Sequence, residues 1–513
     1  MNTSALKTFA PAVRKQLMEA VTRKLDFALT AQTPDYLTTF APQVAALRKL
    51  ATADRSGLID RVAYTWFNRL AALRFMDARG WHPFRARVLT PASPADTQPE
   101  LLKLTRTGAL PEELKSHTAP TRLNDLLDGR IPSPDPQGEV YRHLVLAACR
   151  FYHALLPNLF EKLDDETELL LPDDLLTEHS VVHGFRTEIS DEDCGDGQRA
   201  NVEILGWLYQ FYISERKDQV MARKSAVPIE DIPAVTQLFT PHWIVRYLVE
   251  NSLGRLWLLN RPGSRLREHM PYYIEGEPET DFLKILKPED LKLLDPACGS
   301  AHMLTYAFDL LYLIYEEEGY APTEIPALIL RHNLHGLEIC PRAAQLAELA
   351  LVFKAREKSR RFFQPEHLVR PRIIELRDVR FAENELRDYI HALGLGDLFN
   401  QPMLRLLHQF EEAKNFGSLI QPCLDERAIA IARRAIEAKD LGGQLFLRET
   451  HLKVLRVLEQ AEALTQRYHV VVANPPYMGS GKMNDALSSF VEAHFSRAKT
   501  DLMTCFMERS VSL

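Results

Sequence analysis

Four short apolar segments alternate with stretches of helical periodicity between residues 291 and 473, and this alternation restricts the fold more than any other feature. The segments are residues 291–294, 334–339, 373–376 and 468–473. Strands alternating with helices predict an α/β fold with a doubly wound, mostly parallel, Rossmann-like sheet. Because ligands bind such sheets at the carboxyl ends of the strands, and each segment ends in a polar cluster, we expect a ligand site there.

The remaining sequence predicts a second domain and an insertion. Residues 1–230 show apolar residues at helical spacing, broken by proline-rich loops at 81–99 and 132–136, which predicts an accessory α-helical domain. Within it, residues 201–216 predict an aromatic-rich helix, for which packing against the next domain is favoured over a platform for stacked bases. We expect residues 236–513 to form the domain that contains the sheet, with a helical insertion at about 380–466 that is too long for an ordinary connection.

Composition excludes several classes of protein. The net charge of −7 argues against nucleic-acid binding, which needs clustered Lys and Arg. The argument is weak, because an acidic enzyme can still line one cleft with positive charge. Apolar runs are interrupted by charge and the amino terminus carries charges, so neither a membrane span nor a signal peptide is expected. Six scattered cysteines without a CxxC pair argue against zinc and disulfides and fit a reducing cytoplasm.

A turn containing one glycine follows the first apolar segment. The turn consists of Asp295, Pro296, Ala297, Cys298, Gly299 and Ser300. Gly299 allows close approach of the backbone to a ligand, and the amino terminus of the following helix favours a carboxylate or phosphate. Ala301 and His302 depart from the dinucleotide pattern G-x-G-x-x-G, which disfavours a nicotinamide cofactor. Asp295 either contacts a cationic ligand group or forms the turn.

Acidic residues also close the second and third segments. Glu338 can accept hydrogen bonds from both hydroxyls of a ribose, as the acid of the second strand does in dinucleotide folds, and Ile339 would then pack on an adenine ring. Asp378 either accepts the amino group of that adenine or caps the turn.

The fourth segment ends in Asn474-Pro475-Pro476-Tyr477, the most specific motif in the chain. Two prolines hold a rigid, irregular turn. The Asn474 side-chain carbonyl and the Pro475 backbone carbonyl can together accept both protons of an exocyclic amine. Tyr477 offers a flat face to a base turned out of its stack. These residues predict catalysis by positioning, in which the amine attacks a sulfonium methyl group in one displacement.

A helix start lies upstream, where Thr240 is expected as the cap and Pro241 as the first helical residue of the sequence Leu238–Pro241. Thr240-Pro241, the Asp295–Ser300 turn, Glu338 and the NPPY tetrapeptide occur in the order typical of DNA amino-methyltransferases. Residues 236–513 thus resemble that family, and the whole chain is most similar to the adenine-specific methyltransferases of BREX phage-defence systems.

This resemblance implies the role of each motif. Thr240 and residues 295–300 would hold the methionine part of S-adenosylmethionine, Glu338 the ribose, Asp378 the adenine, and NPPY the target base. The resemblance also implies double-stranded DNA as the substrate, with adenine N6 preferred over cytosine N4 at the level of the family. Other proteins of a phage-defence system are implied partners.

The sequence departs from the family in two places. Ala301 stands where the family usually has glycine, which would tighten the turn without abolishing binding. The chain also stops at Leu513, inside what we expect to be one helix beginning near Ser488, before three further strands and a recognition domain. We therefore expect a fragment or truncated product, with an incomplete sheet whose exposed edge favours aggregation, that is not a complete catalyst.

Two alternatives remain at the level of the sequence. A protein-glutamine methyltransferase also uses NPPY, but the large accessory regions favour DNA. A regulatory component of a defence complex would keep the fold and the cofactor but lack turnover.

Overall fold

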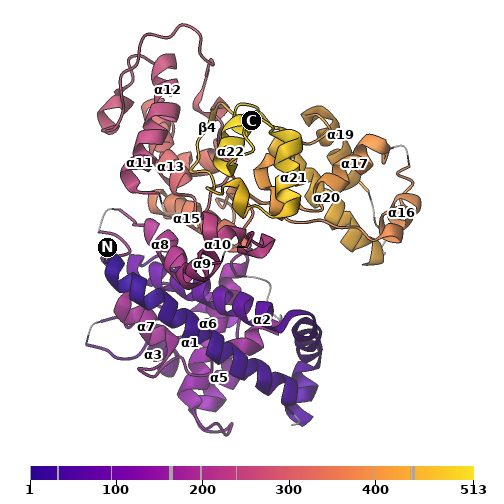
Figure 1. Ribbon diagram of the computed structural model, residues 1–513. Helices are drawn as coiled ribbons and strands as arrows, with labels where there is room; N and C mark the ends of the chain where they lie inside the picture. Colours follow the sequence, from indigo (N-terminus) through magenta and orange to yellow (C-terminus); the bar gives the residue numbers. More distant parts are fainter. Residues whose placement is uncertain are drawn as a thin grey trace. The chain divides into compact units, whose positions relative to one another are not determined.

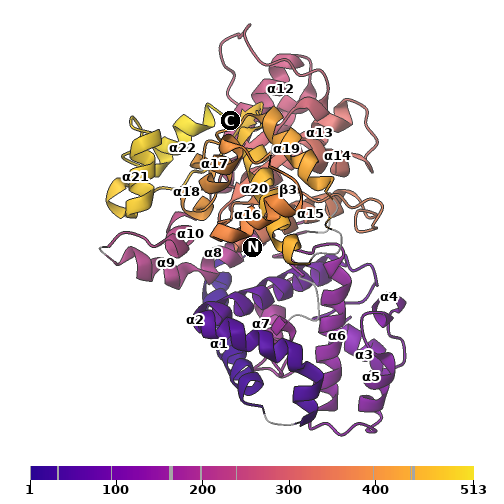
Figure 2. The same cartoon turned by 90° about the vertical axis from the view of Figure 1, so that its right-hand side faces the viewer.

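The computed structural model describes residues 2–31, 34–93, 95–160, 166–196, 199–223, 225–237, 240–396, 398–439, 441 and 445–513. The chain forms two compact units, one of residues 1–215 with 360–368 and one of residues 216–359 with 369–513 (Figures 1 and 2). Among these described residues, no helix combines the length and the apolar character that crossing a bilayer requires.

The named elements among the described residues of the first unit are helices, joined by irregular loops. Its helices are α1 (Thr3–Thr30), α2 (Pro34–Arg79), α3 (Glu100–Arg106), α4 (Glu112–Lys115), α5 (Pro120–Leu127), α6 (Pro136–His153), the 3-10 helix η1 (Glu166–Leu170), α7 (Val181–Glu188) and α8 (Glu203–Tyr212). Irregular backbone at 80–93, 95–99 and 128–135 agrees with the two expected proline-rich loops, except that Pro136 is the first residue of α6. The aromatic side chains of α8 pack inside this unit, where Tyr64 of α2 contacts both Tyr209 and Tyr212.

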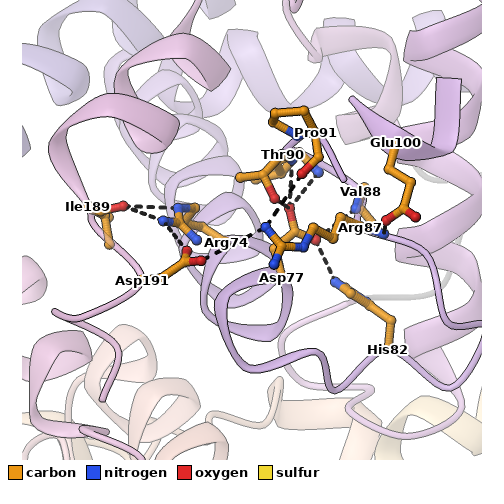
Figure 3. A network of polar contacts seen from close by, with 11 residues as sticks. Arg74, Asp77, His82, Arg87, Val88, Thr90, Pro91, Glu100, Ile189 and Asp191 are labelled. Atoms are coloured by element: carbon orange, nitrogen blue, oxygen red, sulfur yellow. Dashed lines mark hydrogen bonds and ion pairs between the residues drawn. The ribbon is translucent and has the colours of Figure 1, made fainter. Parts of the chain in front are cut away.

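A buried carboxylate organises the loop that follows α2 (Figure 3). Asp77 is fully buried and accepts the backbone N–H groups of Val88, Leu89 and Thr90 at 2.7–2.8 Å, together with a contact from His82 Nε2 at 2.7 Å. Because every contact is made inside the unit, these polar groups serve to fold the loop.

The second unit contains a four-stranded parallel sheet in the order β3-β2-β1-β4. The strands are β1 (Leu293–Asp295), β2 (Leu334–Glu338), β3 (Arg372–Glu375) and β4 (Val470–Val471). Each lies within one or two residues of its predicted segment, so the expected parallel α/β arrangement is confirmed. In the register, Asp295 pairs with Gly336 and Glu338 pairs with Glu375, which aligns the carboxyl ends of three strands.

Helices cover both faces of this sheet. On one face, a side chain at Gly336 would meet Leu304 of α13 at 3.0 Å. On the other face, Leu294 and Leu337 belong to a core shared with the helices between β3 and β4. Successive side chains of a strand point to opposite faces, so the two neighbours Gly336 and Leu337 serve different helical layers.

Helix α9 (Ser214–Met221) spans the border between the units. The helices that follow it before β3 are η2 (Ile229–Asp231), α10 (Ile232–Thr236), α11 (His242–Val249), the π-helix η3 (Glu250–Gly254), α12 (Arg255–Asn260), η4 (Arg265–His269), η5 (Pro288–Asp290), α13 (His302–Glu317), α14 (Ile325–His332) and α15 (Pro341–Lys358). Those after β3 are α16 (Glu383–Ala392), α17 (Gln401–Gln409), α18 (Ala413–Phe416), η6 (Gly417–Leu419), α19 (Glu426–Glu437), α20 (Leu445–Thr465), η7 (Ser480–Lys482), α21 (Asp485–His494) and α22 (Leu502–Ser510). The α16–α20 group occupies the stretch expected as an insertion and lies together in both views.

The border between the units precedes the expected boundary at residue 230. Val220, Val227, Ile232 and Val235 share a core with residues that follow the NPPY tetrapeptide, including Met478. Residues 216–236 therefore fold with the second unit because their apolar side chains are buried there.

Two helix predictions are wrong in detail. The helix after Thr240 begins at His242, with Pro241 as its N-cap and no side-chain capping bond, while Leu238 and Phe239 lie outside the described residues. The helix expected from Ser488 to the chain end is two helices, α21 and α22, separated at residues 495–501. Asp501 causes the break: its carboxylate accepts the Met503 N–H to cap α22 and also accepts the Met478 N–H.

Candidate active site

The turn after β1 closes over the carboxyl end of β2. The Asp295 carboxylate is buried and accepts the Ala297 N–H at 3.1 Å. Cys298, whose side chain is also buried, donates its backbone N–H to the Leu337 carbonyl at 3.0 Å. Gly299 and Ala301 both have left-handed backbone, with φ of +53° and +71°. These bonds and angles turn the chain from β1 into α13 within six residues.

Glu338 joins the ends of the two central strands. Its carboxylate accepts the Gly299 N–H at 2.8 Å and the Cys340 N–H at 2.8 Å, and Gln237 donates to it at 3.4 Å. Because one carboxylate binds backbone donors from two turns, Glu338 sets the distance between the turn after β1 and the turn after β2. One side chain thereby holds much of the candidate cofactor site in place.

Burial raises the pKa of both acids at this edge. The pKa of Asp295 rises to about 8, mainly through desolvation, with a further contribution from the nearby negative charge of Glu338. Desolvation raises the pKa of Glu338 to about 7, although its backbone hydrogen bonds oppose the rise. No lysine or arginine among the described residues pairs with either acid. The pair therefore favours a ligand that brings positive charge.

Ser300 lies at the start of α13, where its hydroxyl is 3.4 Å from His302 Nδ1. Burial lowers the pKa of His302 to about 4, so this imidazole is neutral at physiological pH. The amino terminus of α13 consequently offers uncharged donors rather than a cationic side chain.

The NPPY tetrapeptide follows β4 at the same edge of the sheet. The Val472 N–H still bonds to the Leu294 carbonyl of β1 at 2.9 Å, and the tetrapeptide begins two residues later. Asn474 Nδ2 donates to Thr240 Oγ1 at 3.1 Å, which joins residues 234 positions apart in the sequence. Pro475 and Pro476 are half-buried. The Tyr477 side chain is 50% exposed, so its ring is accessible to a substrate.

The helical insertion contributes residues that the sequence did not single out. Gly417 has φ of +54°, and a Cβ there would lie 3.2 Å from the Ile339 side chain. The neighbouring Ser418 hydroxyl donates to the Pro296 carbonyl at 2.5 Å. Residues 417–418 thus contact both the residue expected to pack on adenine and the turn after β1. No local pattern signals this role, because it depends on a contact more than seventy positions away in the chain.

Two further residues have structural roles at the site. A side chain at Gly336 would approach the Cys298 sulfur at 2.9 Å, so the missing Cβ lets the turn pack on β2. Asp378 is exposed, and its carboxylate accepts the Lys414 N–H at 2.8 Å. This bond attaches the insertion to the chain after β3.

Comparison with known proteins shows similarity to methyltransferases. Residues 332–513 match the Eco57I restriction-modification methylase family, a range that includes Glu338 and NPPY but not Thr240 or the turn after β1. Over its whole length the chain is 36% identical to the adenine-specific methyltransferase BrxX of Escherichia coli O9:H4 (strain HS). It is 32% identical, over 99% of its length, to the adenine-specific methyltransferase PglX of Lacticaseibacillus casei (strain Zhang).

Over its whole length the chain is therefore similar to adenine-specific methyltransferases of the BrxX and PglX type, in agreement with the resemblance inferred from its motifs. It spans 45% of the length of each of these two relatives.

Proposed function

We propose that this chain is the cofactor-binding and target-base part of a DNA methyltransferase that transfers a methyl group from S-adenosylmethionine to the N6 amine of adenine. The observation that supports it most strongly is the convergence of Asp295, Glu338, Thr240 and Asn474 at one edge of a parallel sheet. The Rossmann-like topology of methyltransferases, double-stranded DNA as substrate and a cytoplasmic role in BREX phage defence are parts of the same proposal.

The residues present fit this cofactor. S-adenosylmethionine carries a sulfonium and an ammonium group, and the buried acids Asp295 and Glu338 have no cationic partner among the described side chains. Thr240 and residues 295–300 would hold the methionine part, Glu338 the ribose, and Ile339 the adenine ring. Asp378 remains a candidate for the adenine amino group through the carboxylate oxygen that does not bind Lys414.

The bound cofactor supplies an electrophilic methyl group. The protein residues orient the nucleophile: Asn474 Oδ1 and the Pro475 carbonyl accept the two protons of the target amine, which directs the nitrogen lone pair toward the methyl carbon. Pro476 stiffens the turn, and the exposed Tyr477 ring stacks on a base extruded from the duplex. No covalent enzyme intermediate is needed.

Three measurements test the proposal. Calorimetry should detect S-adenosylmethionine binding, labelled methyl groups should pass to DNA from a host lacking the enzyme, and mass analysis should identify N6-methyladenine. Detection of N4-methylcytosine would instead show that the target base is cytosine. Detection of methylglutamine in protein would support a protein-glutamine methyltransferase. Binding without transfer by the full-length protein would favour a regulatory component, and absence of binding would refute the proposal.

A further inference from the structure

We infer that the Thr240 hydroxyl orients the side-chain amide of Asn474, so that Thr240 is a positioning residue for methyl transfer in addition to a cofactor ligand. The inference rests on the proposed function, because it concerns how Asn474 receives the target amine.

The Thr240 hydroxyl is available for this contact because it caps no helix. Pro241 is the N-cap of α11, and α11 has no side-chain capping hydrogen bond. Thr240 is only 7% exposed, and its oxygen accepts the Asn474 Nδ2 hydrogen at 3.1 Å. The hydroxyl is therefore directed at the tetrapeptide from outside the sheet, and water has little access to compete for the bond.

Orientation matters because an asparagine amide has two different ends. The oxygen accepts hydrogen bonds, whereas the nitrogen only donates them. An exocyclic amine presents two hydrogens, so it must meet the oxygen of Asn474. A rotation of the amide by half a turn would place donors against donors. Since Thr240 accepts from Nδ2, it leaves Oδ1 at the opposite end for the target amine.

The single hydrogen of the Thr240 hydroxyl links this contact to the cofactor. A hydroxyl has one hydrogen, and the Thr240 oxygen uses a lone pair to accept from Asn474. Its hydrogen remains for another acceptor, and a ligand carboxylate is an acceptor only. A hydroxyl donating to such a carboxylate can no longer donate to Asn474 Oδ1. Binding of the methionine carboxylate therefore favours the amide orientation that methyl transfer requires.

Kinetics of Thr240 variants in the full-length protein test the inference, with Thr236→Val as the matched control. The Thr236 hydroxyl bonds only within its own helical segment, to the Ile232 carbonyl at 2.7 Å. At saturating S-adenosylmethionine, Thr240→Val should lower kcat at least about tenfold, because a misplaced group is costly in positioning catalysis. Thr240→Ser should restore kcat to within about threefold of the parent, since it keeps the hydroxyl.

Two kinetic results would overturn the inference. One is a Thr240→Val variant that raises KM for S-adenosylmethionine but leaves kcat unchanged, which would make Thr240 a cofactor ligand only. The other is a Thr240→Ser variant as slow as Thr240→Val, because the hydroxyl would then not be the active group.

A thermal double-mutant cycle tests the contact without catalysis, and it decides whether Thr240 and Asn474 are coupled even if the parent protein transfers no methyl group. Thr240→Val, Asn474→Ala and the double variant are compared with the parent by their Tm values. Shifts that do not add support the hydrogen bond, because each single variant already loses it. Additive shifts would reject it, whereas failure of methyl transfer alone would count against the proposed function.

Discussion

The Glu338 carboxylate accepts the backbone N–H of Gly299 at 2.8 Å, so the end of β2 holds the glycine turn that follows β1. The same carboxylate accepts the Cys340 N–H. Glu338 therefore has a structural role in addition to its proposed contact with ribose, and substitutions should affect both folding and cofactor affinity.

Glu338→Ala should lower S-adenosylmethionine affinity at least tenfold and destabilise the protein by about 2 kcal/mol, because it removes the acceptor of one buried and one part-buried N–H group. Calorimetry and chemical denaturation measure the two effects. Glu375→Ala is the matched control, because Glu375 ends the neighbouring strand in register with Glu338 but pairs with Arg377 at the surface. Equal losses in both variants would contradict a specific role for Glu338.

The raised pKa of Asp295 predicts opposite pH trends for stability and binding. With a pKa of about 8 in the folded state, above its usual value of 3.8, Asp295 stays protonated in the folded chain while it ionises in the unfolded chain. Its contribution to stability is therefore lost as pH rises toward 8. The ionised form binds a cationic cofactor better, so affinity should increase over the same range.

Asp295→Asn should weaken both trends, because an amide does not ionise, whereas the Glu338 carboxyl, with a pKa of about 7, still does. Between pH 5.5 and 8.5 the Tm of the apo-protein should fall less in this variant than in the parent, by at least about 3 °C. The variant should also bind the cofactor more weakly and with a smaller pH dependence than the parent. If Tm falls equally with pH in the two proteins, Asp295 has the ordinary pKa of an aspartic acid.

Asn474→Ala should abolish methyl transfer, with cofactor affinity within about twofold of the parent, because the side chain acts on the target amine. Radiolabelled transfer and calorimetry on the same preparation separate the two properties. The exposed Asn384, which lies in the insertion, provides a control Asn384→Ala. Weak cofactor binding combined with intact transfer in Asn474→Ala would show that the assigned roles are reversed.

Gly417→Val should weaken S-adenosylmethionine binding, because the added side chain points at Ile339, from which even a Cβ would be 3.2 Å away. The left-handed φ of +54° adds a backbone cost of about 1–2 kcal/mol. Gly396→Val is the control, since a Cβ there meets no atom within 4 Å and the backbone is not left-handed. Normal binding by Gly417→Val would exclude η6 from the cofactor site.

Periodicity and strand-end chemistry were enough to predict β1 to β4 and the polar residues that follow them, because both are encoded within a few neighbouring positions. Contacts between distant segments were not predictable. Gly417 over Ile339 and Thr240 against Asn474 join parts of the chain that no local pattern relates. The break between α21 and α22 was missed for the same reason, because Asp501 ends one helical pattern to bond back to Met478.

Ala301 shows how a single local departure from the family pattern can be tested. Its φ of +71° lies in the left-handed region, which disfavours a side chain with a Cβ. Ala301→Gly should therefore stabilise the protein by about 1 kcal/mol, as measured by denaturant unfolding. Ala435→Gly, inside α19 with ordinary helical backbone, should instead destabilise it by about 1 kcal/mol. A destabilised Ala301→Gly variant would mean that packing of the buried Ala301 methyl outweighs the backbone strain.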